Sequence, residues 1–147
     1  MTALIDRLLA EGRGVIVLLP EIALTPQSVA IFCSRYGSRV AVIHSALSTG
    51  ERYDAYCRIK RGEADVVIGT RSAVFAPMEN LGAIIIDEEQ EHTYKSDQNP
   101  KYHTKDVARF RCAHHNALML LASATPSLES YKKALEGVYT LVELRHR

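Results

Sequence analysis

Residues 83–90, AIIIDEEQ, constrain the fold of this chain more than any other stretch. The apolar run is too short for a typical helix and rich in β-branched side chains, so it predicts a buried parallel strand. Asp87, Glu88 and Glu89 follow at once. Adjacent carboxylates repel one another unless a cation or a reacting water uses them, and ligands bind at the carboxyl ends of strands in open α/β sheets. Taken alone, the pattern leaves a solvated acidic turn equally open.

Strand patterns and helix patterns alternate along the whole chain. Short apolar runs predict strands at residues 15–19, 40–43, 65–68, 83–86 and 117–121. Helical spacing and end signals predict helices at about 2–11, 26–36, 48–61, 103–115 and 126–136. The alternation predicts an α/β fold, a three-layer parallel sheet with helices on both faces and right-handed crossovers.

The same Thr-Pro pair stands at the start of two predicted helices, and the end of the chain has a less definite pattern. Thr25-Pro26 and Thr125-Pro126 each predict a capping side chain followed by proline at the first helical position. Residues 138–144 are expected to be extended, either as a strand or as an exit toward another domain.

Composition excludes several classes of protein. A length of 147 residues favours one domain, and a net charge of +1 excludes a highly basic protein that coats nucleic acid. Cys33, Cys57 and Cys112 are odd in number and widely spaced, which argues against a disulfide framework and a zinc site. No apolar run approaches the ~20 residues of a membrane span, and no signal-peptide pattern is present. We therefore expect a cytoplasmic protein with reduced cysteines and no membrane partner.

Several blocks of sequence together resemble the first motor lobe of superfamily 2 helicases. They are PEIALTPQ (20–27), GTRSA (69–73), DEEQ (87–90) and SATPS (123–127). Four longer blocks are similar to the bacterial primosomal helicases of that superfamily. They are HSALSTGER (44–52), DEEQEHTYK (87–95), PKYHTKDVARFR (100–111) and ASATPSLES (122–130). The resemblance covers nearly the whole chain. It implies a RecA-like P-loop NTPase lobe of an ATP-dependent DNA helicase that moves 3′ to 5′ and restarts stalled replication forks.

The resemblance also implies cofactors and partners. ATP and Mg²⁺ would be the cofactors, and single-stranded and forked DNA, primosome proteins and single-strand-binding proteins would be the partners, in the bacterial cytoplasm at the nucleoid.

Roles for the acidic box follow from the same resemblance. Asp87 would hold the Mg²⁺ of Mg-ATP and Glu88 would polarise the attacking water, the division of labour that phosphoryl transfer needs. Glu89 and Gln90 complete the box, and Gln90 stands where many relatives have histidine. The residues Ser123, Ala124 and Thr125 resemble the motif that links hydrolysis to unwinding, through hydroxyl contacts with the acidic box. For Thr125, helix capping alone remains open.

Two further motifs follow strands on the same rim and resemble segments that contact the backbone of single-stranded DNA. The residues concerned are Pro20, Glu21, Thr25, Gly69, Thr70, Arg71 and Ser72. Arg71 supplies charge for a phosphate, and hydroxyls and backbone amides supply donors. A surface ion pair remains open for Arg71, and capping already explains Thr25. His44 and Ser45 are weaker candidates.

The long connection after the acidic box resembles the aromatic-rich loop that senses DNA in primosomal and RecQ helicases. Its candidate residues are Tyr94, Lys95, Lys101, Tyr102 and His103. Aromatic rings stack on unpaired bases while lysines meet phosphates. The alternative is that the two tyrosines merely pin the loop to the core.

No GxxxxGK[ST] phosphate loop occurs in the sequence. In the family that loop lies just upstream of a helix like residues 2–11. We therefore expect residues 1–147 to be a partial ATP-binding lobe that lacks the phosphate-loop strand and exits toward a second lobe at about 138–147. Such a lobe should bind Mg-ATP poorly. The resemblance places the arginine finger, a cysteine-rich zinc region and a fork-binding domain outside this chain.

The missing strand would leave residues 117–121 as an apolar edge. We expect self-association through this edge or through a swapped helix at residues 2–11. Two other functions stay open. One is a stand-alone module that binds single-stranded DNA or replication proteins. The other is a metal-dependent phosphatase or nuclease that uses Asp87, Glu88 and Glu89 with His44.

Overall fold

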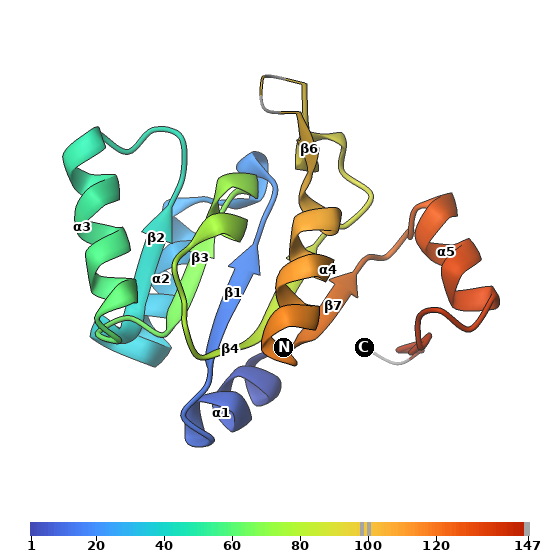
Figure 1. Cartoon of the computed structure of the whole chain (residues 1–147), viewed down its shortest axis with the longest axis horizontal. Helices are drawn as coiled ribbons and strands as arrows, with labels where there is room; N and C mark the ends of the chain where they lie inside the picture. Colours follow the sequence, from blue (N-terminus) through green and yellow to red (C-terminus); the bar gives the residue numbers. More distant parts are fainter. Residues whose placement is uncertain (98, 100, 146–147) are drawn as a thin grey trace.

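A computed structural model of the chain describes residues 1–97, 99 and 101–145. Five strands form one parallel sheet in the order β2-β3-β1-β4-β7 (Figure 1). The strands are β1 (Gly14–Leu18), β2 (Val40–Ile43), β3 (Val66–Gly69), β4 (Leu81–Asp87) and β7 (Leu118–Ala122). All five predicted strands are therefore confirmed to within two residues at each end.

Five helices alternate with these strands. They are α1 (Thr2–Ala10), α2 (Pro26–Tyr36), α3 (Thr49–Lys60), α4 (Thr104–His115) and α5 (Leu128–Leu135). Helix α2 begins as predicted, because the Thr25 side chain accepts from the Ser28 amide at 3.2 Å and Pro26 is the first helical residue. Short 3₁₀ turns occur at Glu21–Ala23, Gly37–Arg39, Arg71–Phe75 and His92–Tyr94.

The sheet lies between two apolar layers. Helices α3 and α4 cover one face and α1 and α2 cover the other, which confirms the three-layer α/β prediction (Figure 1). The central strand β1 is buried along its whole length. The buried helix side chains that face the sheet are Ala55, Ile59, Ala108 and Cys112 on the first face and Ile5, Leu8 and Tyr36 on the second.

One sequence prediction about the end of the chain, the start of its last helix, is wrong in detail, and of the two alternatives for residues 138–144 only the strand is excluded. Helix α5 does not begin with a Thr125 cap; its N-cap is Ser127, whose hydroxyl accepts from the Ser130 amide at 3.2 Å. The start moves because the Ser127 amide itself is held by Glu89 at 2.7 Å. Residues 138–145 form no strand, and positions 146–147 of the expected exit segment lie outside the described residues, as does Pro100 of the block at 100–111.

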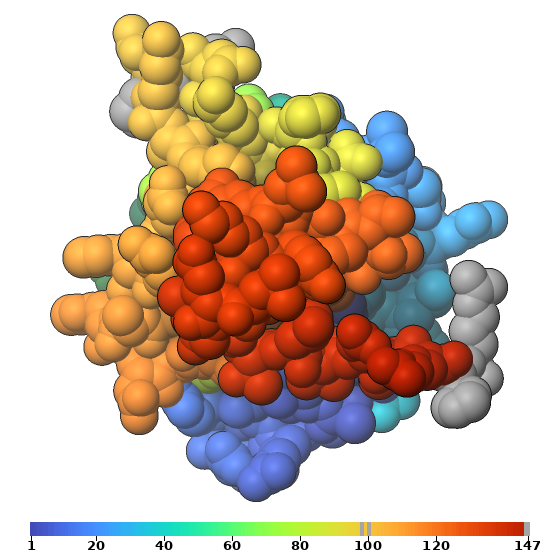
Figure 2. Space-filling view, turned by 90° about the vertical axis from the view of Figure 1, so that its right-hand side faces the viewer, coloured from blue at the N-terminus to red at the C-terminus, as the bar shows by residue number. Residues whose placement is uncertain are grey.

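Strand β7 is at the edge of the sheet. It pairs with β4 alone among the described strands, with Ala83 opposite Leu118 and Asp87 opposite Ala122. Its residues are half-buried except Leu118, which is 48% exposed. Helix α5 and the segment after it lie on this side of the molecule (Figure 2). The edge position expected for this strand is therefore present.

Candidate functional site

The motifs singled out from the sequence meet at one rim of the sheet, because the carboxyl ends of parallel strands lie at the same edge. The segment 20–27 follows β1, the segment 69–73 ends β3, and Asp87 ends β4. A short hairpin of β5 (Lys95–Ser96) and β6 (Tyr102–His103) also stands at this rim (Figure 1).

The acidic box turns sharply where β4 ends. Glu88 has a φ of 50°, a left-handed backbone conformation that residues other than glycine rarely adopt. Its amide donates to Asp87 Oδ1 at 3.0 Å, and its carboxylate accepts from Gln90 Nε2 at 2.7 Å. Burial raises the pKa of Asp87, and the neighbouring Glu88 charge adds to the rise while the Glu88 amide opposes it. The turn thus keeps two carboxylates together at the strand end.

A side-chain bridge joins this box to the segment after β7. Ser123 Oγ lies 2.5 Å from Gln90 Oε1, and the amide of Thr125 donates to Ser123 Oγ at 2.9 Å. The hydroxyl contact expected between Ser123 and the acidic box is therefore present. Ala124 and Thr125 themselves are exposed.

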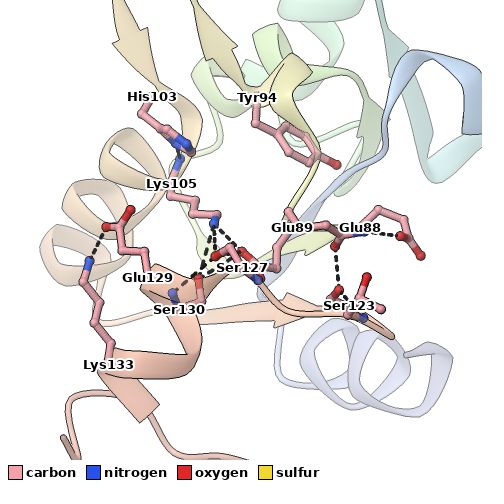
Figure 3. Close-up of polar contacts among 12 residues, drawn as sticks. Glu88, Glu89, Tyr94, His103, Lys105, Ser123, Ser127, Glu129, Ser130 and Lys133 are labelled. Carbon is pink, nitrogen blue, oxygen red and sulfur yellow. Dashed lines mark hydrogen bonds and ion pairs between the residues drawn. The ribbon is translucent and has the colours of Figure 1, made fainter. Parts of the chain in front are cut away.

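The side chain of Glu89 points away from that of Glu88 and toward Lys105, Ser127 and Ser130 (Figure 3). Its side chain is 1% exposed and forms an ion pair with Lys105 of α4. Burial acts to raise the pKa of Glu89, but hydrogen bonds from Lys105, Ser127 and Ser130 outweigh burial and hold the pKa below its usual range. Glu89 is therefore unavailable as a third ligand beside Asp87 and Glu88, which removes the main support for a metal-dependent nuclease.

The segments after β1 and β3 place the expected DNA-contact residues in different settings. Gly69 has a packing role, since a Cβ there would lie 2.1 Å from the Ile43 carbonyl oxygen. Thr70 and Pro20 are buried, Ser72 is half-buried, and Glu21 is exposed. These residues share one rim but differ in how much surface they offer.

Arg71 is held by backbone carbonyls and not by an acidic side chain among the described residues, and its contact with a DNA phosphate stays a prediction. Its Nη1 donates at 3.1 Å to the carbonyls of both Thr93 and Lys95, so it braces the aromatic-rich loop against the turn after β3. No acidic partner of Arg71 occurs among the described residues, so the surface ion pair is wrong.

The two tyrosines of the loop differ from one another. Tyr94 is 1% exposed, and its hydroxyl lies 2.6 Å from the Asp87 carbonyl and 3.1 Å from the Leu18 carbonyl. Its ring offers no face to a base in this conformation, which matches the pinning alternative. Burial raises the pKa of Tyr94, and nearby carboxylates add to that rise. Tyr102 is half-buried and packs edge-on against Phe75, with ring centroids 5.1 Å apart.

The remaining loop residues divide in the same way. Lys95 and Lys101 are exposed at the hairpin. His103 caps α4 by accepting from the Lys105 amide at 3.1 Å, and burial together with the Lys105 charge lowers the pKa of its imidazole. Among the candidate residues of this loop, only the side chains of Lys95 and Lys101 thus make no hydrogen bond, ion pair or ring contact with the described part of the chain.

Sequence reasoning missed Lys105, Ser127 and Ser130. Lys105 stands in the first turn of α4, where the helix dipole disfavours a cation, and this was the one available signal that it has a specific partner. Ser127 and Ser130 were indistinguishable from ordinary helix-start serines.

Asp87 and Glu88 fit Mg²⁺ in their chemistry. The ion prefers hard oxygen ligands and usually keeps several waters, binding through one or two carboxylates plus substrate phosphates. The described residues contain no group of three or more His, Cys, Asp or Glu that would hold a metal alone. Among the same residues, no helix is long and apolar enough to cross a bilayer.

The chain is similar in sequence to replication restart proteins. The protein PriA of Bacillus subtilis is 57% identical over 143 residues, which is 97% of this chain and 18% of that protein. PriA of Chlamydia trachomatis is 48% identical over 139 residues, which is 94% of this chain and 18% of that protein. The chain thus spans about a fifth of the length of these curated relatives.

Solved structures share the fold. The C-terminal domain of the DEAD-box protein Dbp5 matches with a TM-score of 0.58 at 15% identity, covering 89% of this chain and 72% of that domain. The Mycobacterium smegmatis helicase Lhr matches with a TM-score of 0.53 at 18% identity, covering 82% of this chain and 16% of that chain. At this identity the likeness shows the RecA-like α/β fold alone.

A family model settles the classification. The model of the DEAD/DEAH box helicase matches residues 1–134, which is most of the chain and includes every motif described above. A stand-alone binding module is not favoured by this match. The chain therefore belongs to the DEAD/DEAH box helicase family.

Proposed function

We propose that this chain is the first motor lobe of a DNA helicase that hydrolyses ATP and restarts stalled replication forks. The observation that carries the proposal is the bridge from Glu88 through Gln90 to Ser123, which links the acidic box to the segment after β7. The similarity to replication restart proteins supports the choice of DNA and of forks as substrates.

Each residue of the box has a separate task in this proposal. Asp87 would hold the Mg²⁺ of Mg-ATP, and Glu88 would orient and polarise the attacking water. The bound ion supplies charge neutralisation for the phosphates. Gln90 and Ser123 relay a shift of Glu88 to the backbone of Ala124 and Thr125. Lys95 and Lys101 meet DNA phosphates at the rim.

The proposal extends to the setting of the whole protein. A protein that carries this lobe works in the cytoplasm at the nucleoid, with primosome and single-strand-binding proteins as partners and zinc held in a separate cysteine-rich region. The 147-residue chain alone has no helicase activity, because its sequence has no phosphate loop.

Hydrolysis assays test the proposal. In a protein that carries this chain together with a phosphate loop and a second lobe, DNA-stimulated ATP turnover is expected, and Glu88→Gln should lower kcat by about 100-fold or more, since general-base assistance contributes about 10²–10⁴. Glu63→Gln, an exposed carboxylate in the turn after α3, is the matched control. Turnover by the 147-residue chain alone that disappears in Glu88→Gln would contradict the predicted inactivity.

A further inference from the structure

Helix α5 is attached to the domain in an unusual way. Its only buried residue is Ser130, whereas its apolar side chains face solvent. Leu128 is 89% exposed, Leu135 is 69% exposed and Tyr131 is 43% exposed. Apolar burial normally holds an amphipathic helix in place, so another interaction must fix α5 here.

That interaction is a polar cluster centred on Glu89, which we call the Glu89 cluster and which comprises Glu89, Lys105, Ser127 and Ser130 (Figure 3). The Glu89 carboxylate accepts from the Ser127 amide at 2.7 Å, from Ser130 Oγ at 2.9 Å and from Ser127 Oγ at 3.2 Å. Lys105 pairs with the same carboxylate and lies 3.3 Å from Ser130 Oγ and 3.4 Å from Ser127 Oγ. One carboxylate thus joins β4, α4 and the first turn of α5.

The rest of the contact between α4 and α5 is loose. A cavity of about 50 Å³ lies there, lined by charged side chains from both helices such as Arg109 and Lys133. No apolar core fills this space, so the Glu89 cluster provides the close contact between the two helices.

The same carboxylate also fixes the backbone of the acidic box. Glu89 lies between Glu88 and Gln90, and its amide donates to the Ala122 carbonyl at 3.1 Å. Through its side chain and its backbone, Glu89 therefore ties the residue next to the strained turn at Glu88 both to α5 and to the end of β7.

We propose that Glu89 is a positioning residue that fastens α5 to the acidic box through Lys105, Ser127 and Ser130. The carboxylate accepts from the amide of Ser127, the N-cap residue of α5, and Lys105 balances its buried charge. The attachment of α5 is independent of the proposed function, whereas the consequence for ATP hydrolysis rests on it.

Hydrogen exchange of the 147-residue chain tests the attachment. Glu89→Gln and Lys105→Met should each speed exchange of the α5 amides about tenfold or more, because breaking a buried ion pair leaves one charge or donor without its partner. Amides of β1 and β4 should keep their protection. The control is Glu129→Gln, which removes an exposed ion pair with Lys133 on the same helix and should leave exchange unchanged.

Two results would overturn the attachment. One is unchanged α5 exchange in both variants. The other is an equal acceleration in β1, which would mean general destabilisation. Ser130→Ala, which removes a single hydroxyl, provides a milder variant that should still speed α5 exchange selectively if Glu89→Gln does not fold.

Exchanging the charges of Glu89 and Lys105 distinguishes the hydrogen bond from the Ser127 amide from a simple ion pair. The double variant Glu89→Lys with Lys105→Glu restores opposite charges but leaves the Ser127 amide without its acceptor. We expect α5 to stay unprotected in this variant. Full recovery of α5 protection would show that the ion pair alone suffices and that the hydrogen bond from the Ser127 amide to the carboxylate is not needed.

The catalytic consequence has its own readout. In a protein that carries this chain and hydrolyses ATP on DNA, Glu89→Gln should lower kcat about tenfold and leave the KM for ATP nearly unchanged, because the turn holding Glu88 shifts while the nucleotide contacts stay. An unchanged kcat would refute the positioning role. Absent hydrolysis in the unmodified protein would instead refute the proposed function and leave the exchange results standing.

Discussion

Single residues of the acidic box differ because neighbouring side chains turn to opposite sides of one strand end. Asp87 and Glu88 stay at the rim, where burial and mutual repulsion raise the pKa of Asp87. Glu89 enters a pocket of donors that lowers its pKa despite burial. Three carboxylates in sequence therefore occupy two different environments, which an acidic run alone does not distinguish.

The lowered pKa of Glu89 predicts a pH dependence of stability. A carboxyl group with a folded pKa below its unfolded value, about 4.3, contributes stability that is present above that value and is lost as pH falls through the folded pKa. Lys105 of α4 is the charged side chain that contacts Glu89 among the described residues. The titratable side chains that line the adjoining cavity together with Lys105 are His103, Asp106, Arg109, Glu129, Lys133 and Tyr139.

Urea unfolding at several pH values measures this contribution. The difference in free energy of unfolding between the unmodified chain and Glu89→Gln should be largest near neutral pH and should shrink in acid, below about pH 4. A difference that is constant with pH would contradict the prediction.

The buried hydroxyl of Tyr94 gives a second prediction at this scale. Tyr94→Phe should lower the free energy of unfolding by about 1 kcal/mol or more, because the carbonyls of Leu18 and Asp87 lose a donor that no water replaces. Chemical denaturation measures the change. Tyr131→Phe, at an exposed tyrosine, is the control and should be neutral.

The sequence predicts residues whose role is local and fails where the role depends on distant contacts. Thr25 is a cap because Ser28 and Pro26 are its neighbours. Thr125 carries the same signal, yet α5 starts at Ser127 because Glu89, 38 residues away, holds the Ser127 amide. Tyr94 is a loop residue by sequence, and only the folded chain brings Leu18 against its hydroxyl.

Among the elements, the aromatic-rich loop is tied to the rest of the rim by Arg71. The guanidinium joins the 3₁₀ turn after β3 to both sides of Tyr94, and the Thr104 hydroxyl closes the loop on the Tyr94 carbonyl at 2.6 Å. A ligand that attracts Arg71 therefore competes with the loop for its donors. We propose that a DNA phosphate is such a ligand, and its effect would reach the Asp87 carbonyl through the Tyr94 hydroxyl.

Arg71 thus has two expected effects. Arg71→Ala should weaken binding of the chain to a labelled single-stranded oligonucleotide at low salt. Binding of the unmodified chain should also weaken as the salt concentration rises, because each phosphate contact releases counterions. The Arg71→Ala substitution should also speed amide exchange in residues 93–95. Fluorescence anisotropy and hydrogen exchange measure the two effects.

A matched control comes from α3. Arg58 likewise donates to backbone carbonyls, those of Ser38 and Val40, but near the amino end of β2, away from the rim. Arg58→Ala should leave DNA binding unchanged. Equal binding by the Arg71 variant and the unmodified chain would show that the DNA surface lies elsewhere.

At the scale of the whole molecule, the sheet ends on an apolar strand. The register of β7 against β4 leaves the other side of β7 without a strand partner in the described part of the chain. Strand β7 carries no charge and no proline, the features that discourage edge pairing. The alternation of apolar runs predicted this strand, but the strand order that puts it at the edge came from the resemblance, because sequence patterns do not fix order.

We expect the chain to self-associate through this edge at high concentration, a second copy pairing with β7. Leu118→Lys should weaken the association, because Leu118 is 48% exposed and lies at the edge, whereas Leu120 packs toward α1 and α2 and its replacement would disturb the core. Ile31→Lys, at an exposed apolar residue of α2, is the control and should not change it. Light scattering across a concentration series measures the assembly. A monomer at all concentrations, with slow amide exchange at residues 118–122, would show that the chain covers its own sheet edge. The segment in place to do so is α5 with the residues after it, which lie on this side of the molecule (Figure 2).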